Sequence, residues 1–276
     1  MYITLNKTIK EVNGIRYNKN EIMAFVILIV GLTAVYMLTP AANISGSIVC
    51  LSAFLLLSLI QSGYYALASN NEINLKDAVF PTTGDFMEIM KVGIKYFFGV
   101  LGLIFTGCIL PTIVIIGGLA LSYYSATQKT SLELVLTGIV LMILGIVSYF
   151  IIAYMFIIPL NVLFLQSLNI QDLFNIKKAN EKRLENKKLY NSYFSRLILV
   201  SLICYIIGGV IAVIFTICAH EFLAKLPTEI AKENIQIVSS ITALIFQTIW
   251  LPNIHGQFMN YKEQEENTEA TEEINE

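Results

Sequence analysis

Long apolar runs without charge alternate with short polar segments along the chain. A run of about 20 apolar residues crosses the hydrocarbon core of a bilayer as a helix, at roughly 1.5 Å per residue. The pattern predicts transmembrane helices at residues 22–39, 44–67, 92–119, 132–158, 197–219 and 237–254. Pro159 sets the end of the fourth span, because proline lacks a backbone donor and disfavours helix in the preceding residue. Residues 159–168 are then either an extension of this span or an apolar segment along the interface.

The stretch FPTTGDFMEIMKVGIK, just before the third span, has the pattern of a capped amphipathic helix. Asp85 is a good N-cap residue, and Glu88 has the spacing of a capping box. The apolar side chains on one helical face are Phe86, Ile89 and Met90, followed by Gly93, Ile94 and Phe97. We predict a short helix that lies along the cytoplasmic membrane surface and leads into the third span.

The connector between the fourth and fifth spans begins with a related motif and is rich in cations. DLFNIKK, which starts at Asp172, repeats Asp, Ile and Lys at the offsets of DFMEIMK, which starts at Asp85. The candidate contacts for anionic lipid headgroups or for a partner protein are Lys177, Lys178, Lys182, Arg183, Lys187 and Lys188. Cations near a membrane surface attract anionic lipids. The alternative is that these residues only set the topology.

The lysines and arginines also predict the orientation of the chain. Of the 18 in the sequence, all but Lys129, Lys225 and Lys232 lie before the first span or after the second, fourth and last spans. Because such residues accumulate on the cytoplasmic side, this distribution places both termini in the cytoplasm.

The composition agrees with a membrane protein, since 56% of the residues are hydrophobic and 14% are charged. Soluble domains carry about 25% charged residues. We therefore predict an all-α fold over residues 22–255, a polytopic bundle of about six transmembrane helices arranged as three hairpins with cytoplasmic amphipathic helices. Residues 1–21 are expected to form a cytoplasmic amphipathic segment, either a helix or a β-hairpin about Asn13–Gly14. Residues 256–276 are acidic and are expected to be a disordered cytoplasmic tail.

Candidate chemistry is sparse. Ionisable side chains inside spans mark functional sites in membrane proteins, but Glu133, His220, Glu221 and His255 all fall at predicted span ends. The sequence carries neither a zinc-protease motif nor a phosphate-binding loop. We therefore predict no catalytic residues, no metal, no cofactor and no nucleic-acid partner.

Uncharged polar and small residues inside the spans favour helix packing. Gln61, Asn161, Gln166 and Gln247 are expected to form hydrogen bonds between helices rather than contacts with a ligand. Gly117–Gly118 and Gly208–Gly209 are expected to let two helices approach closely, because glycine has no side chain to separate the backbones.

The region from the end of the second span to the start of the third resembles the DUF4013 family of bacterial and archaeal membrane proteins. The residues that carry the resemblance are Gly63–Tyr64, Phe80–Pro81, Asp85–Phe86 and Gly93–Ile94–Lys95, with NIHGQFMNYK (253–262) similar to the family's closing segment. Phe80 departs from the leucine that is usual before the proline. The resemblance implies a multi-span protein of the prokaryotic plasma membrane, and it implies no established activity.

These patterns favour a non-enzymatic multi-pass membrane protein with an accessory, scaffolding or self-protection (immunity-like) role. Its expected partners are membrane lipids with anionic headgroups and an unidentified membrane or cytoplasmic protein. The alternative is a small transporter or channel for an uncharged solute or lipid, which helix kinks at Pro111 and Pro159 would suit. A membrane enzyme is disfavoured, because a site needs convergent ionisable side chains.

Overall fold

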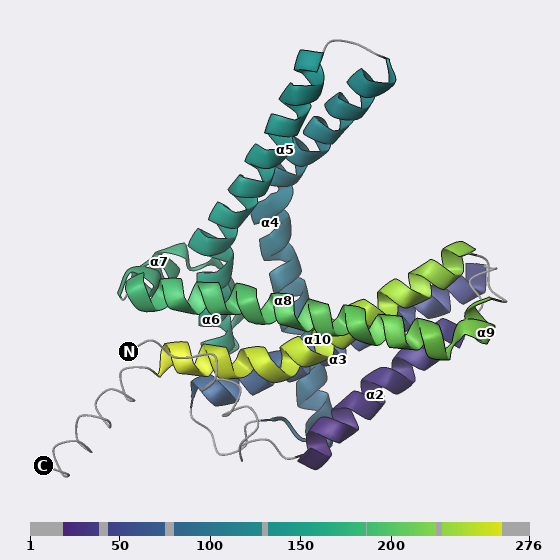
Figure 1. Cartoon of the computed structure of the whole chain (residues 1–276). Coiled ribbons are helices and arrows are strands. Elements are labelled where there is room, and N and C mark those ends of the chain that lie inside the picture. The colour runs from purple at the N-terminus through teal and green to yellow at the C-terminus, as the bar shows by residue number, and fades with distance from the viewer. Residues whose placement is uncertain are drawn as a thin grey trace, which may run out of the picture. The chain divides into compact units, whose positions relative to one another are not determined.

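In the computed structural model (Figure 1), the structure describes residues 19–38, 44–74, 80–128, 132–185, 187–224 and 228–260. Every regular element in these ranges is helical, which confirms the predicted all-α class. The chain divides into two compact units. The first consists of the residues up to Phe97 and those from Lys188 onward, and the second consists of Phe98–Lys187.

The first unit contains the helices that come first and last in the sequence. They are α2 (Lys19–Leu38), α3 (Ile44–Ile73), the 3₁₀ turn η1 (Thr83–Asp85), α8 (Lys187–Cys218), α9 (His220–Leu223) and α10 (Thr228–Met259). Helix α4 (Phe86–Thr127) begins in this unit and continues into the second. The other elements of the second unit are α5 (Leu132–Ile152), the π turn η2 (Ala153–Ile157), α6 (Ile158–Ser167), the 3₁₀ turn η3 (Ile170–Phe174) and α7 (Ile176–Glu185).

Five helical stretches of the described chain are long and apolar enough to cross a membrane. They are Leu51–Ile73, Phe86–Thr127, Leu132–Ser167, Lys187–Cys218 and Ile230–Met259. They correspond to the second to the sixth predicted spans and support a multi-pass membrane protein. The first predicted span corresponds to α2, which is not among the five, so a sixth span stays a prediction.

Several helices extend beyond the limits that the hydropathy pattern predicts, and two of these extensions change another prediction. Helix α4 begins at Phe86, so the predicted short surface helix and the third span are one continuous helix. Helix α10 continues to Met259 with Gln257 and Phe258 buried, so the predicted disordered tail does not begin at residue 256. Polar residues end an apolar run, but many of them favour helix, so a span and its helix end at different places.

The predicted N-terminal segment also overlaps a helix, because α2 begins at Lys19. Residues 1–18 of that segment and residues 261–276 of the predicted tail lie outside the described residues.

The helix continues past Pro159, where the fourth span is predicted to end, which favours the alternative that the following residues extend this span. Helix α5, the π turn η2 and α6 are contiguous, and the stretch runs from Leu132 to Ser167. In a regular α-helix the ring of Pro159 would clash with the carbonyl group of Met155. The π turn contains Met155 and widens the helix at that point. The helix ends at Ser167. The next residue, Leu168, has a φ of 53°, the left-handed conformation that often follows a helix.

In the second unit, α4 and α5 lie side by side as an antiparallel pair (Figure 1). A methyl group added to Gly118 of α4 would overlap the carbonyl oxygen of Gly138 of α5, and one added to Gly145 would lie 3.1 Å from the carbonyl oxygen of Pro111. The predicted close approach is therefore confirmed for Gly118, whereas a methyl group on Gly117 would meet no atom within 4 Å.

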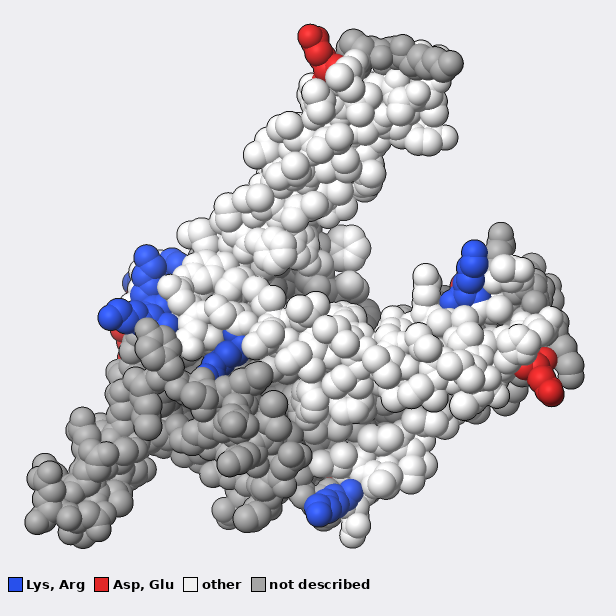
Figure 2. Space-filling model, in the orientation of Figure 1, with Lys and Arg blue, Asp and Glu red and all other residues white. Residues whose placement is uncertain are grey.

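The outward faces of this helix pair are apolar. Large exposed apolar side chains include Ile109, Leu110 and Ile113 on α4 and Ile143 and Leu144 on α5. Figure 2 shows the same surface almost without charged side chains. Helices that are apolar on every face are typical of membrane spans.

In the first unit, α3 packs against both α2 and α10. Gln61 Nε2 of α3 donates to Thr248 Oγ1 of α10 at 2.7 Å, which confirms the predicted hydrogen bond between helices. A methyl group added to Gly208 of α8 would overlap the carbonyl oxygen of Ser239 of α10, so close approach is also confirmed there.

Candidate functional site

The residues of the strongest sequence motif form a helix crossing in the first unit. A methyl group added to Gly63 of α3 would overlap the carbonyl oxygen of Ile89 of α4. One added to Gly93 would overlap the carbonyl oxygen of Leu59 of α3. Ile89 is completely buried, so the prediction that it faces the bilayer surface is wrong. This part of the amphipathic face packs on α3 because two glycines let the backbones meet.

The start of α4 carries the other residues predicted for this segment. Thr82 is the N-cap residue of η1, and its Oγ1 donates to Asp85 Oδ2 at 2.6 Å. The capping bonds expected of Asp85 and Glu88 stay predictions. Phe86 and Glu88 are exposed and Met90 is half-buried. Ile94 is also exposed, so Phe86 and Ile94 are the members of the predicted face that are open to the surroundings.

Aromatic side chains from three segments meet near the same crossing. Tyr64 of α3 stacks on Phe80 with ring centroids 5.3 Å apart, and Phe25 of α2 lies 4.5 Å from Tyr64. Phe25 also lies 5.6 Å from Phe80. Tyr64 and Phe80 are two of the motif residues singled out in the sequence, and their contacts give them a packing role.

A buried histidine joins three helices of the first unit. His255 of α10 is only 1% exposed. Its Nε2 lies 2.6 Å from the hydroxyl oxygen of Tyr65 of α3, and its Nδ1 lies 2.7 Å from the hydroxyl oxygen of Tyr193 of α8. A neutral imidazole has one donor and one acceptor nitrogen, so it donates to one tyrosine and accepts from the other. The three side chains are therefore one hydrogen-bonded chain across α3, α10 and α8.

Aromatic rings and a further polar contact surround this chain. Tyr193 stacks on Phe258 with ring centroids 4.4 Å apart, and Tyr65 lies 5.4 Å from Tyr96 of α4. Asn260 Nδ2 donates to the carbonyl oxygen of Glu72 at 3.0 Å. Polar contacts of this kind between helices fix their register inside a membrane.

The sequence pattern marks little of this cluster in advance. It places His255 at a span end and does not single out Tyr65 or Tyr193. The tyrosines lie 190 and 62 positions from the histidine along the chain, so no local motif links them. The one available signal is a histidine beside an apolar run. Within the described ranges, His, Cys, Asp and Glu side chains form no group of three that could hold a metal ion.

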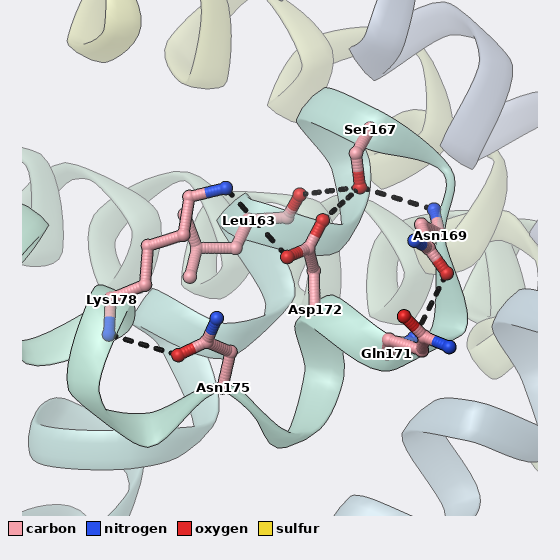
Figure 3. A network of polar contacts seen from close by, with 7 residues as sticks. All are labelled: Leu163, Ser167, Asn169, Gln171, Asp172, Asn175 and Lys178. Atoms are coloured by element: carbon pink, nitrogen blue, oxygen red, sulfur yellow. Dashed lines mark hydrogen bonds and ion pairs between the residues drawn. The ribbon is translucent and has the colours of Figure 1, made fainter.

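A second polar cluster holds the connector between α6 and α7 (Figure 3). Asp172 Oδ2 accepts from Ser167 Oγ at 2.5 Å, and its Oδ1 lies 3.7 Å from Lys178 Nζ. Asn169 Oδ1 accepts from a backbone N–H of η3 at 3.1 Å. Asn175 Oδ1 accepts from the backbone N–H of Lys178 at 3.1 Å. These contacts tie η3 to the end of α6 and to the first turn of α7.

The two related sequence motifs use their aspartates in a similar way. Each aspartate lies in a 3₁₀ turn, Asp85 in η1 and Asp172 in η3. Each accepts a hydrogen bond from a hydroxyl group a few residues earlier, that of Thr82 or Ser167. The likeness between the motifs is therefore also a likeness of local structure.

The structure divides the predicted headgroup-contacting cations into two groups. Lys178 pairs with Asp172, and Lys182 Nζ lies 3.6 Å from Glu185 Oε2. The guanidinium of Arg183 lies 5.7 Å from the ring centroid of Tyr154. Of the six predicted cations, the exposed lysines without an ion pair among the described residues are Lys177, Lys187 and Lys188. Figure 2 shows blue side chains gathered over α7.

The chain matches no protein-family model, no curated protein and no solved structure. The resemblance to DUF4013 therefore receives no support from known proteins. A function for the chain has to be inferred from its own contacts, burial and charges.

Proposed function

We propose that this chain is a non-enzymatic multi-pass protein of the prokaryotic plasma membrane with an accessory, scaffolding or self-protection role. In this proposal six spans form three hairpins, and both termini lie in the cytoplasm. The described helices that would form the hairpins are α2 with α3, α4 with α5, and α8 with α10.

The observation that carries the proposal is the packing of α4 against α5. A methyl group added to Gly118, Gly138 or Gly145 would lie within 3.1 Å of a backbone oxygen of the other helix, so the two helices approach closely at these three positions. The outward side chains are large and apolar. Such a pair suits contact with lipid tails or with apolar faces of other spans, because burying its surface needs no polar partner.

Reconstitution tests the accessory role. The purified chain in proteoliposomes should give solute flux equal to that of empty liposomes across a panel of uncharged solutes. Photo-crosslinking from exposed positions of α4 and α5, such as Ile113 and Leu144, should capture a defined membrane protein in the native membrane. Flux above empty liposomes, or crosslinks to lipid alone at every position, would count against the accessory role.

A second candidate, a small transporter for an uncharged solute or lipid, is favoured by a different observation. Polar side chains are buried along α3 and α10. They are Ser62, Ser69, Asn70, Glu72, Asn234, Thr248, Asn253, His255 and Gln257. Polar residues inside spans mark pathways in transporters as well as contacts between helices. A pocket of about 280 Å³, lined in part by Thr216, His220 and Thr228, lies where α8, α9 and α10 meet.

The same liposomes decide between the two candidates. If α3 and α10 line a pathway, replacing Thr248 by Val should change flux with the fold intact. If the polar residues only join helices, Thr248→Val should lower thermal stability and leave flux at the background level.

A further inference from the structure

We propose that η3, α7 and the first residue of α8, Lys187, form an anchor that binds anionic phospholipid headgroups of the cytoplasmic leaflet. This surface is named the connector anchor. The inference deepens the proposed function, because it rests on the chain being embedded in a membrane, and it names the lipid partner.

The position of the connector anchor follows from the helices on either side of it. The stretch Leu132–Ser167 and the stretch Lys187–Cys218 are both long and apolar enough to cross a membrane. A segment of fewer than about 20 residues that joins two spans begins and ends at the same membrane surface. The connector anchor therefore lies at headgroup level at both of its ends.

The connector anchor has a buried side and an open apolar side. Leu173 and Ala179 are buried, with 0% and 2% of their surface exposed. Phe174 and Ile176 are 58% and 55% exposed on the same short stretch. Large apolar side chains beside lysines are the composition of elements that lie in the membrane interface, where the apolar groups enter the acyl boundary and the cations reach the phosphates.

Ion pairing determines which cations of the connector anchor are available to a lipid headgroup. Lys178 and Lys182 are each paired with an acid, so their charges are largely cancelled at the distance of a headgroup. Lys177 and Lys187 are exposed and have no ion pair among the described residues. Within the connector anchor, Lys177 and Lys187 are therefore the lysines whose positive charge is available to phosphate, and exposed Lys188 follows directly in α8.

The Asp172 network holds this arrangement before lipid binds (Figure 3). It fixes η3 against α6 through Ser167 and against α7 through Lys178. Phe174 is the last residue of this fixed turn, and Ile176 is the first residue of α7. A surface whose backbone is already ordered loses less entropy on binding than a flexible loop.

The test compares two double variants of the full chain in detergent micelles, titrated with phosphatidylglycerol or phosphatidylcholine and read by native mass spectrometry. Lys177→Gln with Lys187→Gln removes the two unpaired lysines of the connector anchor. Lys182→Gln with Glu185→Gln is the matched control, because it changes two residues of the same connector and leaves the net charge unchanged. A near-surface cation contributes a factor of about five in binding.

The wild-type chain should retain phosphatidylglycerol over phosphatidylcholine. The Lys177/Lys187 variant should lose about fivefold or more of its affinity for phosphatidylglycerol, with its affinity for phosphatidylcholine unchanged. The control should bind like the wild type. An equal loss in both variants, or no loss in the first, would overturn the assignment. Equal retention of the two lipids by the wild type would also overturn it.

A second measurement keeps the inference testable if the lysine variants unfold. The chain contains 1 tryptophan, Trp250. Phe174→Trp in a Trp250→Phe background places a fluorophore on the connector anchor, and lipids brominated near the headgroup should quench it in proteoliposomes. Lack of quenching would contradict the inference that the apolar side chains of the connector anchor enter the membrane interface. Release of the chain from native membranes by alkaline carbonate would instead refute the proposed function itself.

Discussion

His255 contributes to the stability of the first unit because both of its ring nitrogens form hydrogen bonds inside the helix bundle. Tyr65 and Tyr193 approach it from two other helices at 2.6 and 2.7 Å. A buried polar group without a partner costs free energy, whereas removing both partners of a hydrogen bond can be nearly neutral. The contribution of His255 therefore depends on the tyrosine hydroxyls that face it.

We predict that His255→Phe lowers the free energy of unfolding by about 1–3 kcal/mol, because it leaves two buried hydroxyls without their partner. The triple variant His255→Phe, Tyr65→Phe, Tyr193→Phe should recover most of this loss. Thermal unfolding in detergent micelles measures both. A triple variant that is no more stable than the single one would show that ring shape, and not hydrogen bonding, matters at this position.

Leu168 is a second residue whose effect is set by its conformation. Its φ of 53° is left-handed, a region that glycine adopts without the cost that other residues bear. Leu168→Gly should be more stable than Leu168→Ala by about 1 kcal/mol. This order is the reverse of that in a helix interior, where alanine is the more stable residue. The two variants remove nearly the same side chain, so their difference in thermal stability isolates the backbone effect.

At the scale of the elements, the glycines divide into those that touch another backbone and those that do not. Gly63 and Gly93 lie against the main chain of the partner helix, whereas a methyl group on Gly31 or Gly102 would meet no atom within 4 Å. The sequence shows all of them as glycines in apolar helices. Only the crossing of α3 and α4 assigns the two roles.

We predict that Gly63→Ala and Gly93→Ala each destabilise the chain by about 1–3 kcal/mol, since the backbones must move apart. Gly31→Ala and Gly102→Ala are the controls and should be neutral or stabilising by up to about 1 kcal/mol, because alanine favours helix. Unfolding midpoints of the four variants would show whether the order holds. Equal effects in both pairs would contradict the crossing.

The ends of the observed helices differ from the ends of the predicted spans. Hydropathy located the five long apolar helices but misplaced their ends, because it follows the solvent preference of side chains and not the continuity of backbone hydrogen bonds. Pro159 is the clearest case. The rule that proline ends a helix assumes regular α geometry. The π turn of residues 153–157 departs from that geometry, so the helix continues through Pro159.

At the scale of the whole molecule, the number of spans depends on whether α2 crosses the membrane. Helix α2 has 20 residues, which corresponds to about 30 Å, close to the thickness of the hydrocarbon core. It is not among the five stretches that meet the length and composition of a span. Whether α2 crosses the membrane decides on which side the N-terminus lies.

Cysteine labelling resolves the topology. In a background without Cys50, Cys108, Cys204 and Cys218, we expect Lys177→Cys to react with a membrane-impermeant maleimide only after the cells are permeabilised. Gln128→Cys should react in intact cells. With six spans, Lys19→Cys should behave like Lys177→Cys, and with five it should react in intact cells. The reverse pattern at Lys177 and Gln128 would invert the predicted orientation.

The sequence by itself determined the helical class and the apolar helices that could cross a membrane, and it predicted the hydrogen bond of Gln61. Each of these depends on local composition or on one residue type in an apolar setting. The tertiary structure decided that Ile89 packs on α3 and that Tyr65 and Tyr193 meet His255. These depend on residues that are distant in sequence or on the rotation of one helix against another. No local pattern encodes that rotation, because it results from how all the packed surfaces fit together.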